Sequence, residues 1–250
     1  EQKTALERLI LTLADSKRVM GIRYSDWNLG APSVETGIAM SSMTQDEWGH
    51  ARLLYAMLKP LGGDPEAVEH DRATSEYASI AALDEQAPDW AALVAMLALA
   101  DRALSVVLES FSRGGYELAG TRIPKMLAEE EFHISLGAAW YKRLASTEGE
   151  ARSLLTAASV AMLPGLLAWV GADDTPMQAL VDAGLIGPAE ERLTAYRDAV
   201  RDLAALVDID VDTVQASSDW DGDRGRTAGE LAEETAERAR GDRNRMLFVG

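Results

Sequence analysis

The 250-residue chain contains no cysteine and only three histidines. Without thiols it forms no disulfide, zinc–thiolate site or iron–sulfur cluster, and it has no cysteine nucleophile. The sequence also lacks the glycine-rich loops that bind dinucleotides and nucleoside phosphates, so we expect no nicotinamide or flavin to be held by a Rossmann-type unit. Electrons for any redox chemistry would therefore come from another protein.

Basic residues are scarce too. The 24 lysines and arginines are outnumbered by 41 aspartates and glutamates, which gives a formal net charge of -17. Proteins that bind nucleic acid or anionic membranes present a basic surface, so this balance argues against both partners. The sequence opens on no apolar signal segment, and we expect a cytoplasmic protein.

Helical periodicity dominates what is present. Apolar residues recur with a helical period in four long segments, which we place at 4–24, 34–58, 90–113 and 124–144. Joints that contain glycine and proline separate them, and no alternating pattern indicates strands. Shorter helices are predicted at 153–170, 188–206 and about 228–239. We therefore predict an all-α protein with one domain over residues 1–250, in which bundle helices at about 4–144 precede additional C-terminal helices and a tail at about 150–250.

One segment is long enough to span a membrane. Residues 153–172 carry no charge, but they contain Pro164 and Gly165, and no basic cluster flanks them. We interpret this segment as a buried helix kinked at Pro164, or as a helix buried against another subunit, and not as a membrane span.

Two of the three histidines follow a glutamate by three positions. Glu47 precedes His50, and Glu130 precedes His133. Residues three apart project from the same face of a helix, so each pair can bind one ion. Both pairs lie within apolar helical stripes, where a carboxylate is costly unless a partner such as a divalent metal neutralises it. The alternative interpretation is a pair of buried Glu–His hydrogen bonds.

Two Glu-x-x-His pairs and one carboxylate from each of two further helices form the ligand set of four-helix di-iron carboxylate proteins. Asp101 is the candidate on the third helix because apolar residues bracket it; its alternative role is a buried ion pair with an arginine. On the first helix we favour Asp26, which is nearer the helix end, over Asp15. The pattern predicts a ferritin-like four-helix bundle with the metal ligands Asp26, Glu47, His50, Asp101, Glu130 and His133, the last five also being catalytic. Iron and manganese both accept these ligands.

Several segments resemble the phenylacetyl-CoA oxygenase (ring 1,2-epoxidase) subunits of the phenylacetic acid catabolic family. The resemblance is carried by residues 20–27 (MGIRYSDW), 31–33 (APS) and 45–52 (QDEWGHAR), and it continues through Asp101 and residues 130–133 (EEFH). The spacing from Asp101 to His133 is similar to that of the family's catalytic subunit. Around helix one the chain is more similar to the metal-free structural subunit, and Asp26 stands where the catalytic subunit has a glutamate just before a tryptophan.

The resemblance implies a di-iron oxygenase of the monooxygenase or epoxidase type, in which two iron ions activate dioxygen to oxygenate an aromatic or acyl-CoA-type substrate. It implies as partners a paralogous helical subunit, a small accessory subunit and a separate flavin/iron–sulfur reductase; a homo-oligomer is the alternative assembly. A CoA thioester would require basic side chains near the pocket mouth, for which Lys17, Arg18, Arg23 and Arg52 are candidates. Two other classes stay open: a metal-free structural subunit, and a different di-metal enzyme such as a ferroxidase or manganese catalase.

Overall fold

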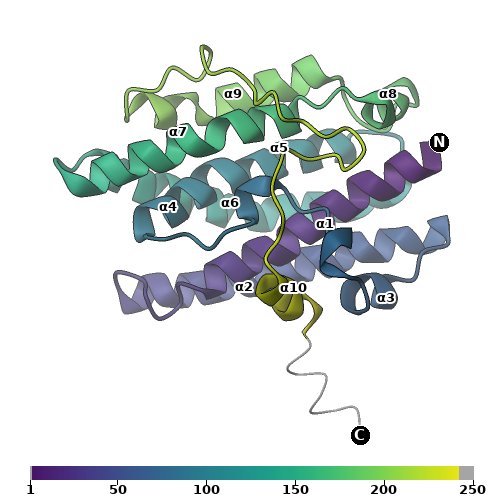
Figure 1. The fold of residues 1–250 in the computed structure, drawn as a ribbon, viewed down its shortest axis with the longest axis horizontal. Coiled ribbons are helices and arrows are strands. Elements are labelled where there is room, and N and C mark those ends of the chain that lie inside the picture. Colours follow the sequence, from purple (N-terminus) through teal and green to yellow (C-terminus); the bar gives the residue numbers. More distant parts are fainter. Residues whose placement is uncertain (1, 242–250) are drawn as a thin grey trace, which may run out of the picture. The chain divides into compact units, whose positions relative to one another are not determined.

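The computed structural model describes residues 2–241. Within this range the regular structure is helical throughout, and the sole β-type pairing is an isolated bridge between Asp221 and Arg226. The predicted all-α, ferritin-like fold is confirmed (Figure 1).

The chain divides into two compact units. Among the described residues, the N-terminal unit comprises residues 3–86 and 228–241, and the central unit comprises Ala87–Thr227 with Gln2. Each unit contains two of the four predicted bundle segments. The expectation of a single domain over residues 1–250 stays a prediction.

The N-terminal unit is built on two long helices. Its elements are α1 (Gln2–Ser25), α2 (Val34–Tyr55), η1 (Ala56–Leu61), α3 (Pro65–His70), the short turns η2 (Thr74–Glu76) and η3 (Ala81–Leu83), and α10 (Glu233–Arg240). The Ser33 hydroxyl accepts a hydrogen bond from the Thr36 amide and so caps the start of α2. Helix α10 is attached to α1 by hydrogen bonds, because Arg18 donates to the Ala239 carbonyl and Arg23 donates to the Thr235 hydroxyl.

The central unit is a stack of helices around one continuous apolar helix. Its elements are α4 (Trp90–Ala95), the π-helical η4 (Met96–Ala100), α5 (Asp101–Ser112), α6 (Glu117–Ala145), α7 (Glu150–Val170), α8 (Thr175–Asp182) and α9 (Ala189–Ala205). Elements α4, η4 and α5 follow one another without a break. Helix α5 packs against α6 and α9, and α4 packs against α7.

Helix α10 begins at Glu233, five residues after the expected start at about 228. Helix α6 also starts away from its predicted position. It begins at Glu117, seven residues before the expected start at Pro124. A proline inside a helix removes the amide donor to the carbonyl four residues earlier, which here belongs to Gly120. Both Pro124 and Gly120 are exposed, so water can satisfy that carbonyl and the helix continues through the proline.

Two helices are long and apolar enough to cross a membrane, namely Trp90–Ser112 and Glu150–Val170. In the first, 94% of the most apolar window is buried, as expected of a core helix. In α7 only 44% is buried, and Leu154 and Val160 are among its exposed residues. The expectation that 153–172 is a buried helix therefore holds for one face of α7 within this chain. The alternative, in which another subunit covers the helix, stays a prediction.

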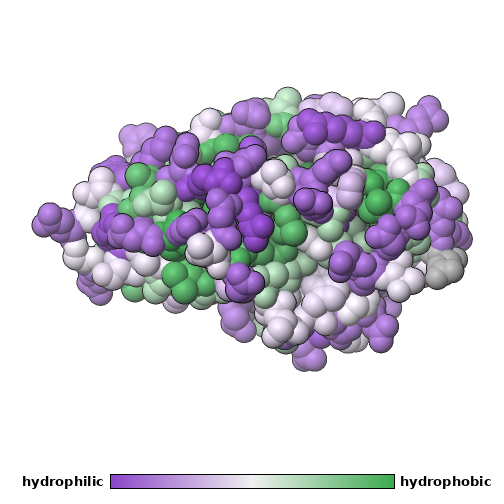
Figure 2. Space-filling view, turned by 90° about the horizontal axis from the view of Figure 1, so that it is seen from above, coloured by the Kyte–Doolittle hydropathy of each residue, from purple (hydrophilic) through white to green (hydrophobic). Residues whose placement is uncertain are grey.

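The surface agrees with the charge balance of the sequence. Figure 2 shows a face on which hydrophilic residues predominate and hydrophobic residues form scattered groups. Such a distribution is typical of a chain with a net charge of -17.

Candidate metal centre

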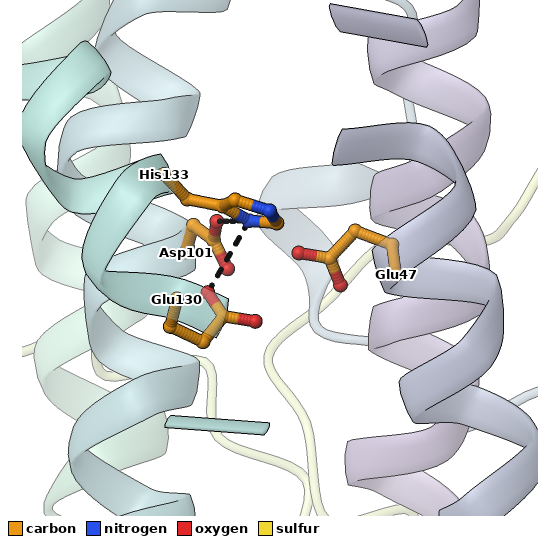
Figure 3. Close-up of side chains that lie close together, drawn as sticks. All are labelled: Glu47, Asp101, Glu130 and His133. Atoms are coloured by element: carbon orange, nitrogen blue, oxygen red, sulfur yellow. Dashed lines mark hydrogen bonds and ion pairs between the residues drawn. The ribbon is translucent and has the colours of Figure 1, made fainter. Parts of the chain in front are cut away.

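The central unit brings three of the predicted ligands together. Asp101 is the first residue of α5, and Glu130 and His133 lie one turn apart on α6. The Nδ1 atom of His133 is 3.4 Å from Asp101 Oδ2 and 3.4 Å from Glu130 Oε2, the two contacts dashed in Figure 3. One potential ligand atom from each residue lies within 4.8 Å of the other two. All three residues are at most 2% exposed.

A short π-helical segment positions Asp101. Residues Met96–Ala100 form one wide turn directly before the aspartate, and such turns inside α-helices occur frequently at functional sites. Helix α6 approaches this turn closely at Gly137, where an added Cβ would lie 2.9 Å from Leu97 Cγ and 3.5 Å from Ala98 Cα. The glycine therefore permits the contact that places Asp101 beside His133, one turn away from Gly137 on α6.

The charges of this cluster fit a bound cation. Two carboxyl groups face one imidazole nitrogen, which can donate only one proton to them. Two buried carboxylates this close repel each other, and ionising both is costly unless a positive charge lies between them. Two oxygen donors and one imidazole nitrogen suit a divalent transition metal. The residues present therefore fit the metal site that the sequence predicts.

The N-terminal unit carries the second Glu-x-x-His pair. Glu47 and His50 lie on α2 and are 0% and 1% exposed, matching the burial of the α6 pair. Figure 3 also labels Glu47. Within its own unit, Glu47 accepts a hydrogen bond from Lys17 of α1, with 3.1 Å between Nζ and Oε1 and both side chains fully buried. A close approach of α1 and α2 at Gly21 favours this pair, since a Cβ there would lie 2.6 Å from Trp48 Nε1.

Asp26 has a different set of partners. Its carboxylate lies 3.4 Å from the Arg23 guanidinium and 2.7 Å from that of Arg238. Asp26 also lies nine residues beyond Lys17, about 13 Å along the helix direction from the level at which α1 meets Glu47. Asp26 therefore pairs with two arginines, and the residue of α1 that lies beside Glu47 is Lys17.

Asp15 is also engaged elsewhere. It accepts hydrogen bonds from the Tyr55 hydroxyl, the Arg72 guanidinium and the Ala78 amide. Burial, with the charge of Asp15, raises the pKa of Tyr55 well above its ordinary value. This network attaches the chain around residues 72–78 to α1.

Three of the four basic residues considered for a CoA thioester are buried. Lys17 is 0%, Arg18 8% and Arg23 2% exposed, so the expectation that they lie near a pocket mouth is wrong. Arg23 donates to the carbonyls of Leu83 and Asp84 and thereby attaches the end of η3 to α1. Arg52 is exposed, with its Nε 3.5 Å from Glu69 Oε1.

Sequence reasoning missed two features of the site, the π-helical turn and Lys17. Gly137 continues the apolar stripe of Glu130 and His133, and a glycine inside a long helix is a signal of close backbone approach. Gly21, one turn after Lys17, is a similar signal on α1. The lysine itself carries no pattern that distinguishes it from a surface cation.

Comparison with known proteins gives one family. The family described as phenylacetic acid catabolic protein matches residues 1–245, nearly the whole chain. No curated protein matches the sequence significantly. The match covers both Glu-x-x-His pairs and Asp101, and it agrees with the resemblance carried by those segments. The chain belongs to the phenylacetic acid catabolic protein family.

Proposed function

We propose that this protein is the oxygen-activating subunit of a multicomponent di-iron monooxygenase. Its two metal ions would be bound by five side chains, Glu47, His50, Asp101, Glu130 and His133. The observation that carries the proposal is the buried cluster of Asp101, Glu130 and His133 in a chain of the phenylacetic acid catabolic family. The repeat of the Glu-x-x-His spacing on α2 supports a second ion.

The proposed set leaves out a carboxylate from α1. Asp26 is held by Arg23 and Arg238, and Asp15 by Tyr55 and Arg72. Lys17 takes the corresponding position beside Glu47. We propose that the Lys17 ammonium orients the Glu47 carboxylate by a charge-assisted hydrogen bond.

The reaction requires two electrons and two protons for each dioxygen. When bound, the ferrous ions supply the reducing chemistry at oxygen, after which one oxygen atom enters the substrate and the other leaves as water. The five side chains would hold the ions, and because all five are buried they would exclude bulk water from the reacting atoms. The electrons would come from a separate flavin/iron–sulfur reductase, since this chain has no cysteine.

We further propose an aromatic acyl-CoA as the substrate, in line with the catabolic family, and the cytoplasm as the place of action. A paralogous helical subunit and a small accessory subunit would complete the assembly. Iron is proposed over manganese because oxygenation needs a metal that reduces dioxygen; turnover of peroxide alone would favour a manganese catalase, and turnover of ferrous iron alone a ferroxidase.

The test is substrate-dependent oxygen consumption. Iron-loaded protein with a flavin/iron–sulfur reductase, reduced nicotinamide and phenylacetyl-CoA should consume dioxygen and release an oxygenated thioester. Glu130→Gln should lower the rate at least 100-fold, because it removes one ligand charge with little change in shape. Glu131→Gln, at the exposed neighbouring position, is the matched control and should leave the rate unchanged. Equal rates for both variants would overturn the assignment of Glu130.

A metal-free structural subunit is the second candidate, and the Lys17–Glu47 pair is the observation that favours it. A buried ammonium neutralises Glu47 without any metal. Under this alternative, the wild-type protein takes up no iron on anaerobic reconstitution and oxygen consumption needs another subunit. Iron bound by the wild-type protein and lost in His133→Gln would decide for the oxygen-activating subunit.

A further inference from the structure

The exposed residues of α2 all lie along one stripe of the helix. From Glu35 to Arg52 they follow one another at intervals of three or four positions, as do residues on a single helical face, and one adjacent residue extends the stripe at each end. They are Val34, Glu35, Ile38, Ser42, Gln45, Gly49, Arg52 and Leu53. The stripe runs the full length of the 22-residue helix, about 30 Å. We call it the α2 stripe.

The α2 stripe exposes large apolar side chains. Val34 is 76% and Ile38 66% exposed, and Leu53 at the other end of α2 is 37% exposed. Leu29, in the loop before α2, is fully exposed. Between the charged ends at Glu35 and Arg52 the stripe carries no charge. An uncharged, partly apolar face is unusual in a chain with a net charge of -17 and marks a candidate interface.

The order of residues along the α2 stripe is self-complementary. When a second α2 packs antiparallel about a two-fold axis at the middle of the helix, Ile38 faces Gly49 of the second copy and Ser42 faces Gln45. Towards the ends, Val34 faces Leu53 and Glu35 faces Arg52. A large side chain thus meets a glycine, a hydroxyl meets an amide, and opposite charges meet. Such a reciprocal match is what an isologous two-fold interface requires.

We propose that the α2 stripe is the contact surface of a homodimer, with the α2 helices of two copies packed antiparallel in this register. We choose a second copy as the partner because the antiparallel register places Glu35 of each copy opposite Arg52 of the other, so opposite charges meet at both ends of the stripe. Gly49 has open space around it, with no atom within 4 Å of an added Cβ, so it leaves room for Ile38 of the second copy. Arg52 is 69% exposed although it lies near Glu69, and can therefore reach Glu35 of the second copy.

The size of the surface sets the expected affinity. One pair of helices with adjacent loops buries on the order of 1,000 Å², near the lower limit of specific interfaces. We therefore expect a dissociation constant in the micromolar range, about 1–50 μM. Like charges elsewhere on the two acidic copies should make the dimer stronger as salt is raised to about 0.15 M.

The first test is the mass of the full-length protein in solution. The chain has a mass of 27.0 kDa, so sedimentation equilibrium across the micromolar range should show a shift towards twice that value. Gly49→Leu fills the space facing Ile38 and should weaken the dimer at least tenfold without loss of helicity. Val160→Ser, at the exposed face of α7, is the matched control and should leave the dimer unchanged. A monomer at every concentration up to about 100 μM would overturn the proposal.

Charge reversal tests the register. Glu35→Arg and Arg52→Glu each bring like charges together twice in the dimer, so each alone should weaken it several-fold. The double variant restores opposite charges and should recover the wild-type dissociation constant. A double variant as weak as the sum of the single variants would contradict this register.

Cross-linking tests the same register independently of charge. The chain has no cysteine, so Ile38→Cys with Gly49→Cys introduces the only two thiols. Within one copy these positions lie eleven residues apart on α2, about 16 Å, too far for an internal disulfide. Mild oxidation should give a covalent dimer from the double variant and none from either single variant. Equal cross-linking of a single variant, or a dimer lost in Val160→Ser, would place the interface elsewhere and overturn the proposal.

Discussion

Lys17 Nζ lies 3.1 Å from Glu47 Oε1, and neither side chain has any exposed surface. A buried ammonium on a candidate metal ligand links the packing of α1 and α2 to the chemistry of the site. When no metal is bound, the Lys17 ammonium supplies the positive charge that compensates the Glu47 carboxylate.

Lys17→Met should destabilise the metal-free protein by about 3 kcal/mol, because it leaves Glu47 buried without its cation. Iron should recover part of this loss by supplying positive charge to the same carboxylate. Urea unfolding of metal-free and iron-loaded protein measures both effects. Lys125→Met is the control, since its pair with Glu129 lies at the surface, and it should cost less than 0.5 kcal/mol. A loss below 1 kcal/mol for Lys17→Met would contradict a functional pair.

Asp26→Asn separates a structural aspartate from a ligand. The carboxylate joins Arg23 of α1 to Arg238 of α10, so its loss should destabilise the protein by about 1–3 kcal/mol. Iron content per chain should stay at the wild-type value. Loss of iron in Asp26→Asn, with the helical content unchanged, would restore Asp26 to the ligand set.

Gly137→Ala tests the close contact that positions Asp101. Alanine ordinarily stabilises a helix relative to glycine, by up to about 1 kcal/mol. Here its Cβ would lie 2.9 Å from Leu97 Cγ, so we expect a net loss of about 1 kcal/mol together with weaker iron binding. Gly165→Ala in α7 is the matched control, because the nearest atom, Thr227 Oγ1, would lie at an ordinary contact distance of 3.7 Å, and it should stabilise the protein. Stabilisation by both variants would show that the turn before Asp101 tolerates displacement.

The fold and much of the site could be predicted because they follow from local periodicity. Helical spacing places Glu47 with His50 and Glu130 with His133, and the apolar neighbours of Asp101 indicate that it points inward. The partner of Glu47 could not be predicted in this way. It depends on how far α1 slides along α2, which the loop at residues 26–33 and the contact at Gly21 determine. Asp26 was favoured for its place near the end of the first helix, and that place alone does not tell which residue of α1 lies beside Glu47.

The π-helical turn at Met96–Ala100 also could not be predicted from the sequence, but for a different physical reason. Its sequence is uniformly apolar. An extra residue in a helical turn can be recognised only as a shift in the spacing of polar and apolar residues, and this segment has no polar residue to show such a shift. The start of α6 was missed because proline was taken as a helix boundary, whereas an exposed Pro124 is tolerated within the helix.

Alkaline pH should destabilise the protein through a buried tyrosine of the N-terminal unit. Burial raises the pKa of Tyr77 from 10.0 to about 12. A group whose pKa is raised on folding binds its proton more tightly in the folded state, so this contribution is complete below pH 10 and is lost as the pH rises through 12. Two pKa units correspond to about 3 kcal/mol. Urea unfolding between pH 8 and 11.5 should show the decline.

Tyr77→Phe should reduce that decline. The Tyr77 hydroxyl is buried and finds no hydrogen-bond partner among residues 2–241, so its removal should be neutral or stabilising at pH 8. Tyr55→Phe is the contrasting variant, because it removes the 2.6 Å hydrogen bond to Asp15 and should cost about 1–3 kcal/mol at pH 8. A pH dependence that is identical in wild type and Tyr77→Phe would assign the alkaline loss to other groups.

The most direct test of the central claim is the number of iron ions bound per chain after anaerobic ferrous reconstitution, measured by elemental analysis. The proposed site predicts close to two irons in the wild type and a clear loss in His133→Gln and His50→Gln. A folded wild-type protein that binds no iron would contradict the metal site and leave the structural subunit, with Lys17 neutralising Glu47, as the function of this chain.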